Sequence, residues 1–200
     1  MLRSDVQIIS VDDHVIETPN VWQDRVAAKY KDAAPKMHTD DQGRDYWVFE
    51  SRPYFNIGLN AVVGKPREKW GLDPTALSDM RPGCYDIKER LRDMDEDGIW
   101  AGLNFPSFPG FAGSTFFNAT DKELSLVCIQ AWNDWHLEEW CGAAPERQIP
   151  MAIVPYWDIA ASAAEVRRVA ANGSRTISFC EAPHAVGMPS IHDAAWDPFW

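Results

Sequence analysis

The sequence predicts an α/β fold in which parallel strands alternate with amphipathic helices. Two observations predict it: short apolar segments recur between longer segments with helical periodicity, and capping or turn residues separate the two kinds. The expected strands are residues 6–11, 99–105, 149–154 and 176–179, and the expected helices are residues 86–97, 120–141 and 158–172. This alternation favours right-handed crossovers, with helices covering one side of the sheet and each strand lying beside the one before it.

The first expected strand ends in a group of polar residues. The run from Val6 to Val11 is followed directly by Asp12, Asp13 and His14. Asp12 and His14 are two positions apart, so on an extended backbone their side chains point to the same side. A carboxylate and an imidazole that converge suit Zn²⁺ or Mn²⁺. The same spacing also fits an ordinary polar surface loop, so the residues alone leave both interpretations open.

Residues 32–83 differ from the rest of the chain and are expected to form an insertion after the first strand. Turn residues divide this stretch; residues 40–43 resemble a hairpin turn, with a strand at 45–49. Such insertions often cover an active site, although an ordinary irregular segment is the alternative. Before the insertion, apolar spacing predicts a short helix over residues 20–31. We expect residues 1–200 to form one domain.

The limits of the three longer helices follow from their capping residues. Asp86 with Glu89 forms a capping-box-like pair, and Gly98 ends that helix. Thr120 is the expected N-cap of the second helix, and Asp158 is the expected N-cap of the third.

The end of the sequence predicts a further helix, because an N-cap aspartate and a proline begin the final stretch from Asp197 to Trp200. About four strand–helix units come before it, whereas a closed barrel needs eight and typically ~250 residues. We therefore expect an N-terminal portion of a longer protein; a complete protein of 200 residues with an open sheet is the alternative. Expressed alone, residues 1–200 are expected to aggregate or associate, because the outer strands keep open edges. They are also expected to hold Zn²⁺ or Mn²⁺ poorly, because Asp12 and His14 alone leave coordination positions unfilled.

Composition narrows the possible partners. A net charge of −11 argues against a nucleic acid or an anionic membrane as partner. The four cysteines are widely spaced and form no C-x-x-C pair, which is typical of a reduced cytoplasmic protein. The sequence shows neither a signal-peptide pattern nor the ~18 apolar residues of a membrane-spanning helix. A small-molecule substrate, which the resemblance described next implies, is the expected partner.

Four stretches together resemble the amidohydrolase-related family, which includes aminocarboxymuconate-semialdehyde decarboxylase and gamma-resorcylate decarboxylase. They are residues 11–17 (VDDHVIE), residues 81–98 (RPGCYDIKERLRDMDEDG), Phe105-Pro106, and Met188-Pro189-Ser190 followed by residues 196–200 (WDPFW). They occur in the family's order and span nearly the whole chain, so the combination is more specific than any single stretch. The resemblance implies a (β/α)₈ TIM barrel, of which this chain supplies about the first four strand–helix units plus the insertion.

The resemblance also implies a divalent metal, Zn or Mn, at the C-terminal face of the barrel. In the family a pair of residues on the first strand binds the metal, and Asp12 and His14 match that pair. The family match therefore favours the ligand interpretation of both residues. The family's further ligands, a histidine after the fifth strand and an aspartate after the eighth, are expected beyond Trp200. His184 and His192 precede the expected fifth strand and are not assigned as ligands.

The activity implied by the resemblance is that of a metal-dependent enzyme of the amidohydrolase superfamily. Non-oxidative decarboxylation of a small aromatic or unsaturated carboxylic acid is expected, since the best-known members are such carboxy-lyases. A bound metal can instead lower the pKa of a water molecule, so hydrolysis of an amide or ester is the alternative. A catalytically inactive fragment or binding protein is a further alternative. The full-length protein is expected to be a homo-oligomer.

A carboxylate substrate calls for a cationic side chain, and Arg52 and Arg81 are candidates by charge. Aromatic residues could wall a pocket for a flat substrate, and ordinary packing is their alternative role: Trp47, Tyr54, Phe105 and Phe108. His136 lies within an expected helix and is predicted to be partly buried or at the surface rather than a metal ligand.

Overall fold

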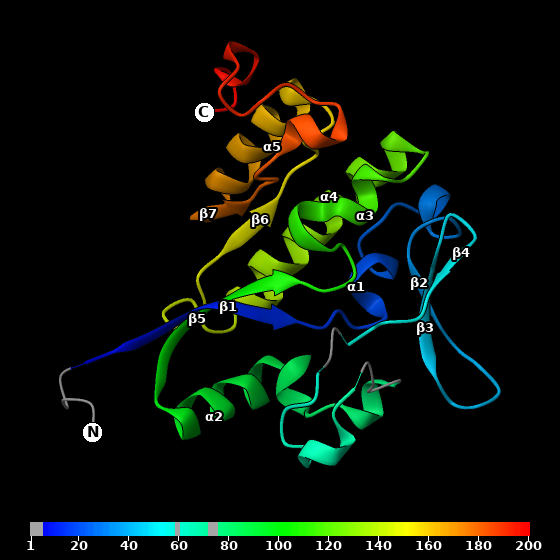
Figure 1. The fold of residues 1–200 in the computed structure, drawn as a ribbon, viewed down its shortest axis with the longest axis vertical. Coiled ribbons are helices and arrows are strands. Elements are labelled where there is room, and N and C mark those ends of the chain that lie inside the picture. Colours follow the sequence, from blue (N-terminus) through cyan, green and yellow to red (C-terminus); the bar gives the residue numbers. More distant parts are fainter. Residues whose placement is uncertain (1–5, 59–60, 72–75) are drawn as a thin grey trace.

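The computed structural model describes residues 6–58, 61–71 and 76–200 and confirms an α/β architecture with parallel strands (Figure 1). Its four parallel strands are β1 (Ile8–Val15), β5 (Ile99–Pro106), β6 (Met151–Ile153) and β7 (Thr176–Ser178). β1 pairs with β5, and β6 pairs with β7. Gly102 of β5 bridges in parallel to Gln148, which lies just before β6. The strands therefore follow one another in chain order with β1 at the edge, as predicted.

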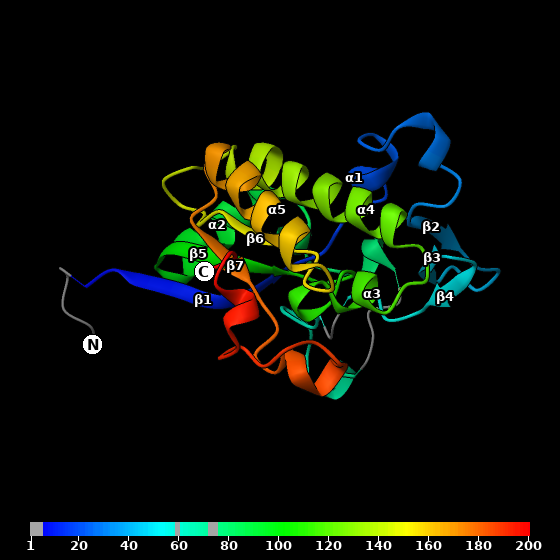
Figure 2. The same ribbon diagram turned by 90° about the horizontal axis from the view of Figure 1, so that it is seen from above.

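The predicted helices are also present. They are α2 (Ile87–Asp97), α4 (Lys122–Trp135) and α5 (Ile159–Ala171), with the shorter α1 (Asn20–Gln23) and α3 (Ser114–Phe117). Figure 2 shows α4 and α5 on one side of the parallel strands. Asp86 accepts from the backbone N–H groups of Lys88 and Glu89 at the start of α2, and Gly98 ends the helix with a φ of 71°. Asp158 caps α5 by accepting from Ala161 N–H. These three predicted capping residues are therefore confirmed.

Two details of capping differ from prediction. The N-cap of α4 is Asp121, whose carboxylate accepts from Leu124 N–H, rather than Thr120. Thr120 N–H instead donates to the carboxylate of Glu50, a contact from another part of the chain. The second difference is at α2, where the backbone N–H of Asp86 donates to the Pro82 carbonyl. That N–H therefore has a partner other than the Glu89 side chain that a capping box requires.

The other differences concern lengths. α4 continues as a π-helix, η6 (His136–Cys141), so the predicted helix over 120–141 has two kinds of turn. The predicted helix over 20–31 is interrupted: α1 is followed by a separate 3₁₀-helix, η1 (Ala28–Tyr30). At the end of the chain, a 3₁₀-helix capped by Asp193, η8 (Ala194–Trp196), precedes the predicted N-cap Asp197.

The stretch from 32 to 83 contains a small antiparallel sheet that packs beside the parallel strands (Figure 1). Its strands are β2 (Lys36–Thr39), β3 (Asp45–Phe49) and β4 (Arg52–Tyr54), in the order β2-β3-β4. The predicted turn and the strand at 45–49 are present, whereas β2 and β4 were not predicted. The remaining short 3₁₀-helices are η2 (Arg67–Lys69), η3 (Leu77–Asp79), η4 (Pro82–Cys84), η5 (Phe111–Gly113) and η7 (Pro183–Val186).

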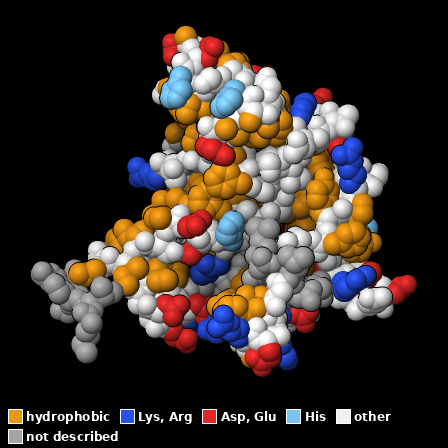
Figure 3. All heavy atoms as spheres, viewed as in Figure 1, with side chains coloured by type: hydrophobic (Ala, Val, Ile, Leu, Met, Phe, Trp, Pro, Cys, Tyr) orange, Lys and Arg blue, Asp and Glu red, His pale blue; other side chains and the backbone are white. Residues whose placement is uncertain are grey.

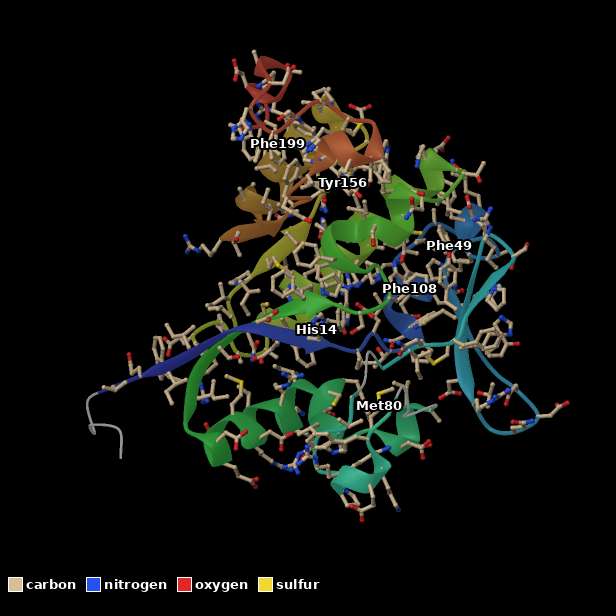
Figure 4. The ribbon with its side chains drawn as sticks, viewed as in Figure 1. His14, Phe49, Met80, Phe108, Tyr156 and Phe199 are labelled. Carbon is tan, nitrogen blue, oxygen red and sulfur yellow. The ribbon has the colours of Figure 1, made fainter. Side chains whose placement is uncertain are left out.

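The main core is rich in tryptophan and phenylalanine. Trp22 meets Trp47 edge to face at 5.1 Å, and Phe108 lies 5.2 Å from both rings. Figure 4 shows Phe49 and Phe108 in the region between the small sheet and α3–α4. Edge-to-face aromatic packing of this kind adds to the stabilisation from buried area. It fixes the insertion against the ends of β1 and β5. In the described ranges, no helix is both long and apolar enough to cross a membrane.

Candidate metal and catalytic site

The carboxyl-terminal half of β1 carries the predicted ligand pair. Asp12 and His14 are exposed, whereas Asp13 between them is half-buried and Val15 is buried. This alternation fits an extended strand that directs Asp12 and His14 to the same side. The apolar run predicted a strand that ends at Val11, whereas in the structure the strand continues to Val15.

A β-bulge includes Asp12, the first residue of the pair. Ser10 is opposite Gly102 and Asp13 is opposite Asn104, so Val11 and Asp12 together face one residue of β5. Bulges add local twist and change the direction of the following side chains. Val11 and Asp12 are consequently both exposed, which interrupts the alternation that applies on either side.

Asp12 and His14 line the same cavity, which has a volume of about 350 Å³ and also contains Asp13 and Arg90. Its other walls come from α2, from the insertion with the adjoining Cys84, and from Ile16 next to β1 and Ile99 in β5. Figure 3 shows histidine, acidic and basic side chains close together in the middle of this face, and Figure 4 places His14 there on β1. The predicted pair therefore lies in a hollow beside the insertion that has charged side chains and a largely apolar wall.

Arg90 holds the end of β1 in place, and sequence reasoning gave it no role. Its Nε donates to the Gly83 carbonyl at 2.5 Å, and its Nη2 donates to the His14 carbonyl at 2.7 Å. Burial lowers the pKa of this guanidinium. A signal was present in the sequence, because Arg90 follows Ile87 by three positions and precedes Met94 by four. An arginine on the apolar stripe of a helix faces the protein rather than the solvent.

The end of the insertion is also held by short contacts to α2 and to the residue after β1. Arg81 forms a two-pronged ion pair with Asp93, at 2.8 and 2.5 Å, which lowers the pKa of the Asp93 carboxyl. Ile16 N–H donates to the Cys84 carbonyl at 2.9 Å. The predicted substrate contact by Arg81 remains a prediction, although this guanidinium already has a carboxylate partner. Arg52 is exposed on β4 and also remains a predicted contact.

A substitution at Gly83 tests this packing. A Cβ atom there would lie 2.1 Å from Asp93 Oδ2, so Gly83→Ala must displace the carboxylate that binds Arg81. We expect the free energy of unfolding to fall by about 1–2 kcal/mol, the range for inserting a methyl group into a packed site. Gly71→Ala is the control, because a Cβ at Gly71 meets no atom within 4 Å. Urea denaturation measures both variants, and equal stability of the two would contradict the proposed close packing.

Glu17 connects the loops that follow β1 and β5. Its carboxylate accepts from Ser107 N–H, Phe108 N–H and the indole N–H of Trp132, at 2.8–3.0 Å. The side chain is completely buried, and this burial raises the pKa of Glu17 to about 7 although the three donors act in the opposite direction. Ser107 Oγ donates to the Val15 carbonyl, which completes the connection. Glu17 therefore stabilises the strand ends near His14.

The four aromatic residues suggested as a pocket wall have different positions. Trp47 and Phe108 are buried in the core cluster, and Tyr54 packs on Phe108 at 5.4 Å. Phe105 instead lies opposite His14 in the strand register, with ring centroids 6.1 Å apart. It stacks on the exposed Phe111 at 5.6 Å. Only Phe105 of these four is thus placed beside the predicted ligand pair.

Three other histidines, His136, His184 and His192, lie away from the predicted ligand pair. His136 is fully buried and stacks on Trp132 at 4.7 Å, and burial lowers its pKa to about 4. Its burial exceeds the partly buried or surface position that was predicted. His184 and His192 are exposed near the end of the chain. Within residues 6–58, 61–71 and 76–200, the structure brings together no group of three or more His, Cys, Asp or Glu side chains able to hold a metal.

Comparison with known proteins gives the same fold. Neither a protein-family model nor a curated protein sequence matches the chain. Among solved structures, it is similar to an amidohydrolase from Mycobacterium avium subsp. paratuberculosis K-10, with a TM-score of 0.72 and 22% identity. The similarity covers 99% of this chain and 56% of that one.

Two decarboxylase structures are also similar. One is 5-carboxyvanillate decarboxylase from Novosphingobium aromaticivorans DSM 12444, complexed with manganese and 4-hydroxy-3-methoxy-5-nitrobenzoic acid; the TM-score is 0.56 with 18% identity, over 98% of this chain and 46% of that one. The other is 2,6-dihydroxybenzoate decarboxylase from Rhizobium, with a TM-score of 0.52 and 16% identity, over 97% and 45%. The resemblance inferred from the sequence is confirmed at the level of fold: this chain shares the fold of amidohydrolase and decarboxylase structures and spans about half of their length.

Proposed function

We propose that this chain supplies the Asp12–His14 part of a metal-dependent enzyme of the amidohydrolase superfamily built on a (β/α)₈ barrel. The supporting observation is the position of the pair: both side chains are exposed on the last residues of an edge strand and line one cavity. In barrels of this type the functional residues lie at the carboxyl ends of the strands. The parallel order of β1, β5, β6 and β7 fits the first half of such a barrel.

The donor set fits a divalent metal of the zinc or manganese kind. Asp12 offers a carboxylate oxygen and His14 offers an imidazole nitrogen, and both are ligand types that these metals accept. When bound, such a metal acts as a Lewis acid that polarises a substrate oxygen or lowers the pKa of water. We expect weak binding to this chain, because two side chains leave most coordination positions unfilled.

The proposed reaction is non-oxidative decarboxylation of a small aromatic or unsaturated carboxylic acid. Two of the similar structures are decarboxylases, which supports this reaction. Phe105 and Phe111 add a stacked pair of rings next to His14, a surface that suits a flat substrate. Arg52 and Arg81 remain candidates for the substrate carboxylate, and the complete enzyme is proposed to be a homo-oligomer.

Hydrolysis of an amide or ester is the second candidate reaction. It is favoured by the similarity to the Mycobacterium amidohydrolase, which has a TM-score of 0.72. The two reactions place the same demand on Asp12 and His14, so metal binding is the property to test first.

Binding of Mn²⁺ to the chain tests the proposal. Paramagnetic broadening of backbone amide NMR signals detects weak binding and shows where it occurs. We expect added Mn²⁺ to broaden the signals around residues 11–15, and Asp12→Ala with His14→Ala to abolish this effect. A matched control is His38→Ala with Asp41→Ala, which removes another exposed His and Asp from the small sheet and its turn. Equal broadening in wild type and the Asp12/His14 variant would refute the metal site.

A further inference from the structure

The guanidinium of Arg90 joins three parts of the chain at one point. It projects from α2, and its two donors meet the carbonyl of Gly83 at the end of the insertion and the carbonyl of His14 on β1. The ring of Trp140 lies under the same group, 5.6 Å from its central carbon. A planar guanidinium with two donors in fixed directions determines the relative positions of the groups it binds better than a single-donor cation.

The contact with His14 involves the backbone and not the imidazole. Arg90 therefore leaves the side chain of His14 free while fixing the peptide that carries it. Asp12 lies two residues earlier on the same strand and is itself one of the two bulge residues, where backbone pairing is interrupted. Arg90 anchors the strand at His14, just after that interruption.

We propose that Arg90 is a positioning residue for the Asp12–His14 pair: by binding the His14 carbonyl, it holds the end of β1 in the orientation that lets both side chains reach one metal ion. This inference rests on the proposed metal site. Residues that orient metal ligands without touching the metal typically change metal affinity about 10-fold to 100-fold when mutated. The role differs from simple stabilisation, because its loss weakens metal binding in chains that remain folded.

The chain contains a matched control for this role. Arg147 also donates Nε to one backbone carbonyl, that of Trp100 at 2.5 Å, and Nη2 to another, that of Ile99 at 3.1 Å. Its contacts are at the amino-terminal end of β5, whereas Arg90 acts at the carboxyl-terminal end of β1. Nη2 of Arg147 also pairs with the Asp95 carboxylate at 2.8 Å. Arg147 is half-buried, as Arg90 is. Arg147→Gln therefore removes the same type of backbone contact, together with the Asp95 ion pair, at the opposite end of the β1–β5 pair from Asp12 and His14.

The experiment compares Mn²⁺ titrations of wild type, Arg90→Gln, Arg90→Lys and Arg147→Gln by the broadening of NMR signals around residues 11–15. The melting temperature of each variant is measured in parallel. We expect Arg90→Gln to raise the apparent dissociation constant for Mn²⁺ by about tenfold. Arg90→Lys keeps the positive charge but loses the pair of donors in fixed directions. Its affinity for Mn²⁺ should therefore lie between those of wild type and Arg90→Gln. Arg147→Gln should bind Mn²⁺ within twofold of wild type even if its melting temperature falls.

Three results would overturn the inference. Unchanged Mn²⁺ affinity in folded Arg90→Gln is the first; if that variant does not fold, wild-type affinity in Arg90→Lys has the same meaning. A loss of affinity in Arg147→Gln equal to that in Arg90→Gln would show a general effect of stability. Failure of wild type to bind Mn²⁺ better than the Asp12/His14 variant would refute the proposed metal site itself, and the inference with it.

Discussion

Replacement of Glu17 by leucine should lower the free energy of unfolding by about 3 kcal/mol, because three buried donors lose their acceptor. The donors are the backbone N–H groups of Ser107 and Phe108 and the indole N–H of Trp132. A buried donor without a partner costs roughly 1–3 kcal/mol. Removal of the buried carboxyl offsets part of this loss, since burial disfavours its charged form. Urea denaturation at pH 7 measures the net change.

Glu50 provides the control for this prediction. Its carboxylate also accepts two backbone N–H groups, those of Thr120 and Asp121, at 2.9 and 2.6 Å, but these contacts are exposed. Water can replace the carboxylate there, so Glu50→Leu should cost about 1 kcal/mol or less. If the two leucine variants lost equal stability, burial of the Glu17 contacts would not be the reason for the effect.

Stability should depend on pH through two buried groups with opposite signs. The pKa of Glu17 is raised to about 7, so the folded chain holds this proton where the unfolded chain has released it. The Glu17 contribution therefore falls as the pH rises from about 4.5 to 7. The pKa of His136 is lowered to about 4, so the unfolded chain takes up this proton first as the pH falls. The His136 contribution is therefore lost between about pH 6.5 and 4.

The two contributions should nearly cancel in wild type and become visible in single variants. One pKa unit corresponds to about 1.4 kcal/mol. Each group therefore changes the free energy of unfolding by about 3 kcal/mol across the shared range from pH 4.5 to 6.5. Relative to wild type, Glu17→Gln should lose about this amount of stability on acidification, and His136→Phe should gain it. Taking the difference from wild type removes the contribution of the other acidic residues.

Denaturant unfolding at several pH values tests this prediction. Slopes of the same sign in the two variants would show that other groups control the pH dependence. The ring of Trp132 lies between the two sites, because its N–H donates to Glu17 and its face stacks on His136. The double variant therefore measures whether the two titrations are coupled through this side chain.

Local patterns in the sequence predicted the helices and the strand order, because their causes lie within a few residues. Asp86, Gly98 and Asp158 act on backbone groups one helical turn away or less. The placement of Asp12 and His14 on the same side of one strand likewise follows from their two-residue spacing. The interrupted helix over 20–31 shows the limit of periodicity: Trp22 and Val26 are buried as the pattern requires, but the backbone between them is not continuously helical.

The contacts that complete the site could not be predicted in this way, because they join distant residues. Arg90 is 76 positions from His14, and Ser107 is 90 positions from Glu17. The apolar stripe of α2 could have indicated that Arg90 faces inward, but it could not have named the carbonyl that Arg90 binds. Trp47 and Phe108 were assigned equally to a pocket or to the core, and only the fold places them in the core.

The separation of β1 from its partner has a consequence for synthesis on the ribosome. β1 emerges well before β5, because the residues of β5 that pair with it follow about 90 positions later. At translation rates of about 5–20 residues per second, the nascent strand waits roughly 5–20 s for its partner. The β2–β4 meander can form during that interval, because its strands are neighbours in the chain. Until β5 arrives, the apolar residues of β1 lack the strand that pairs with them and are available to chaperones.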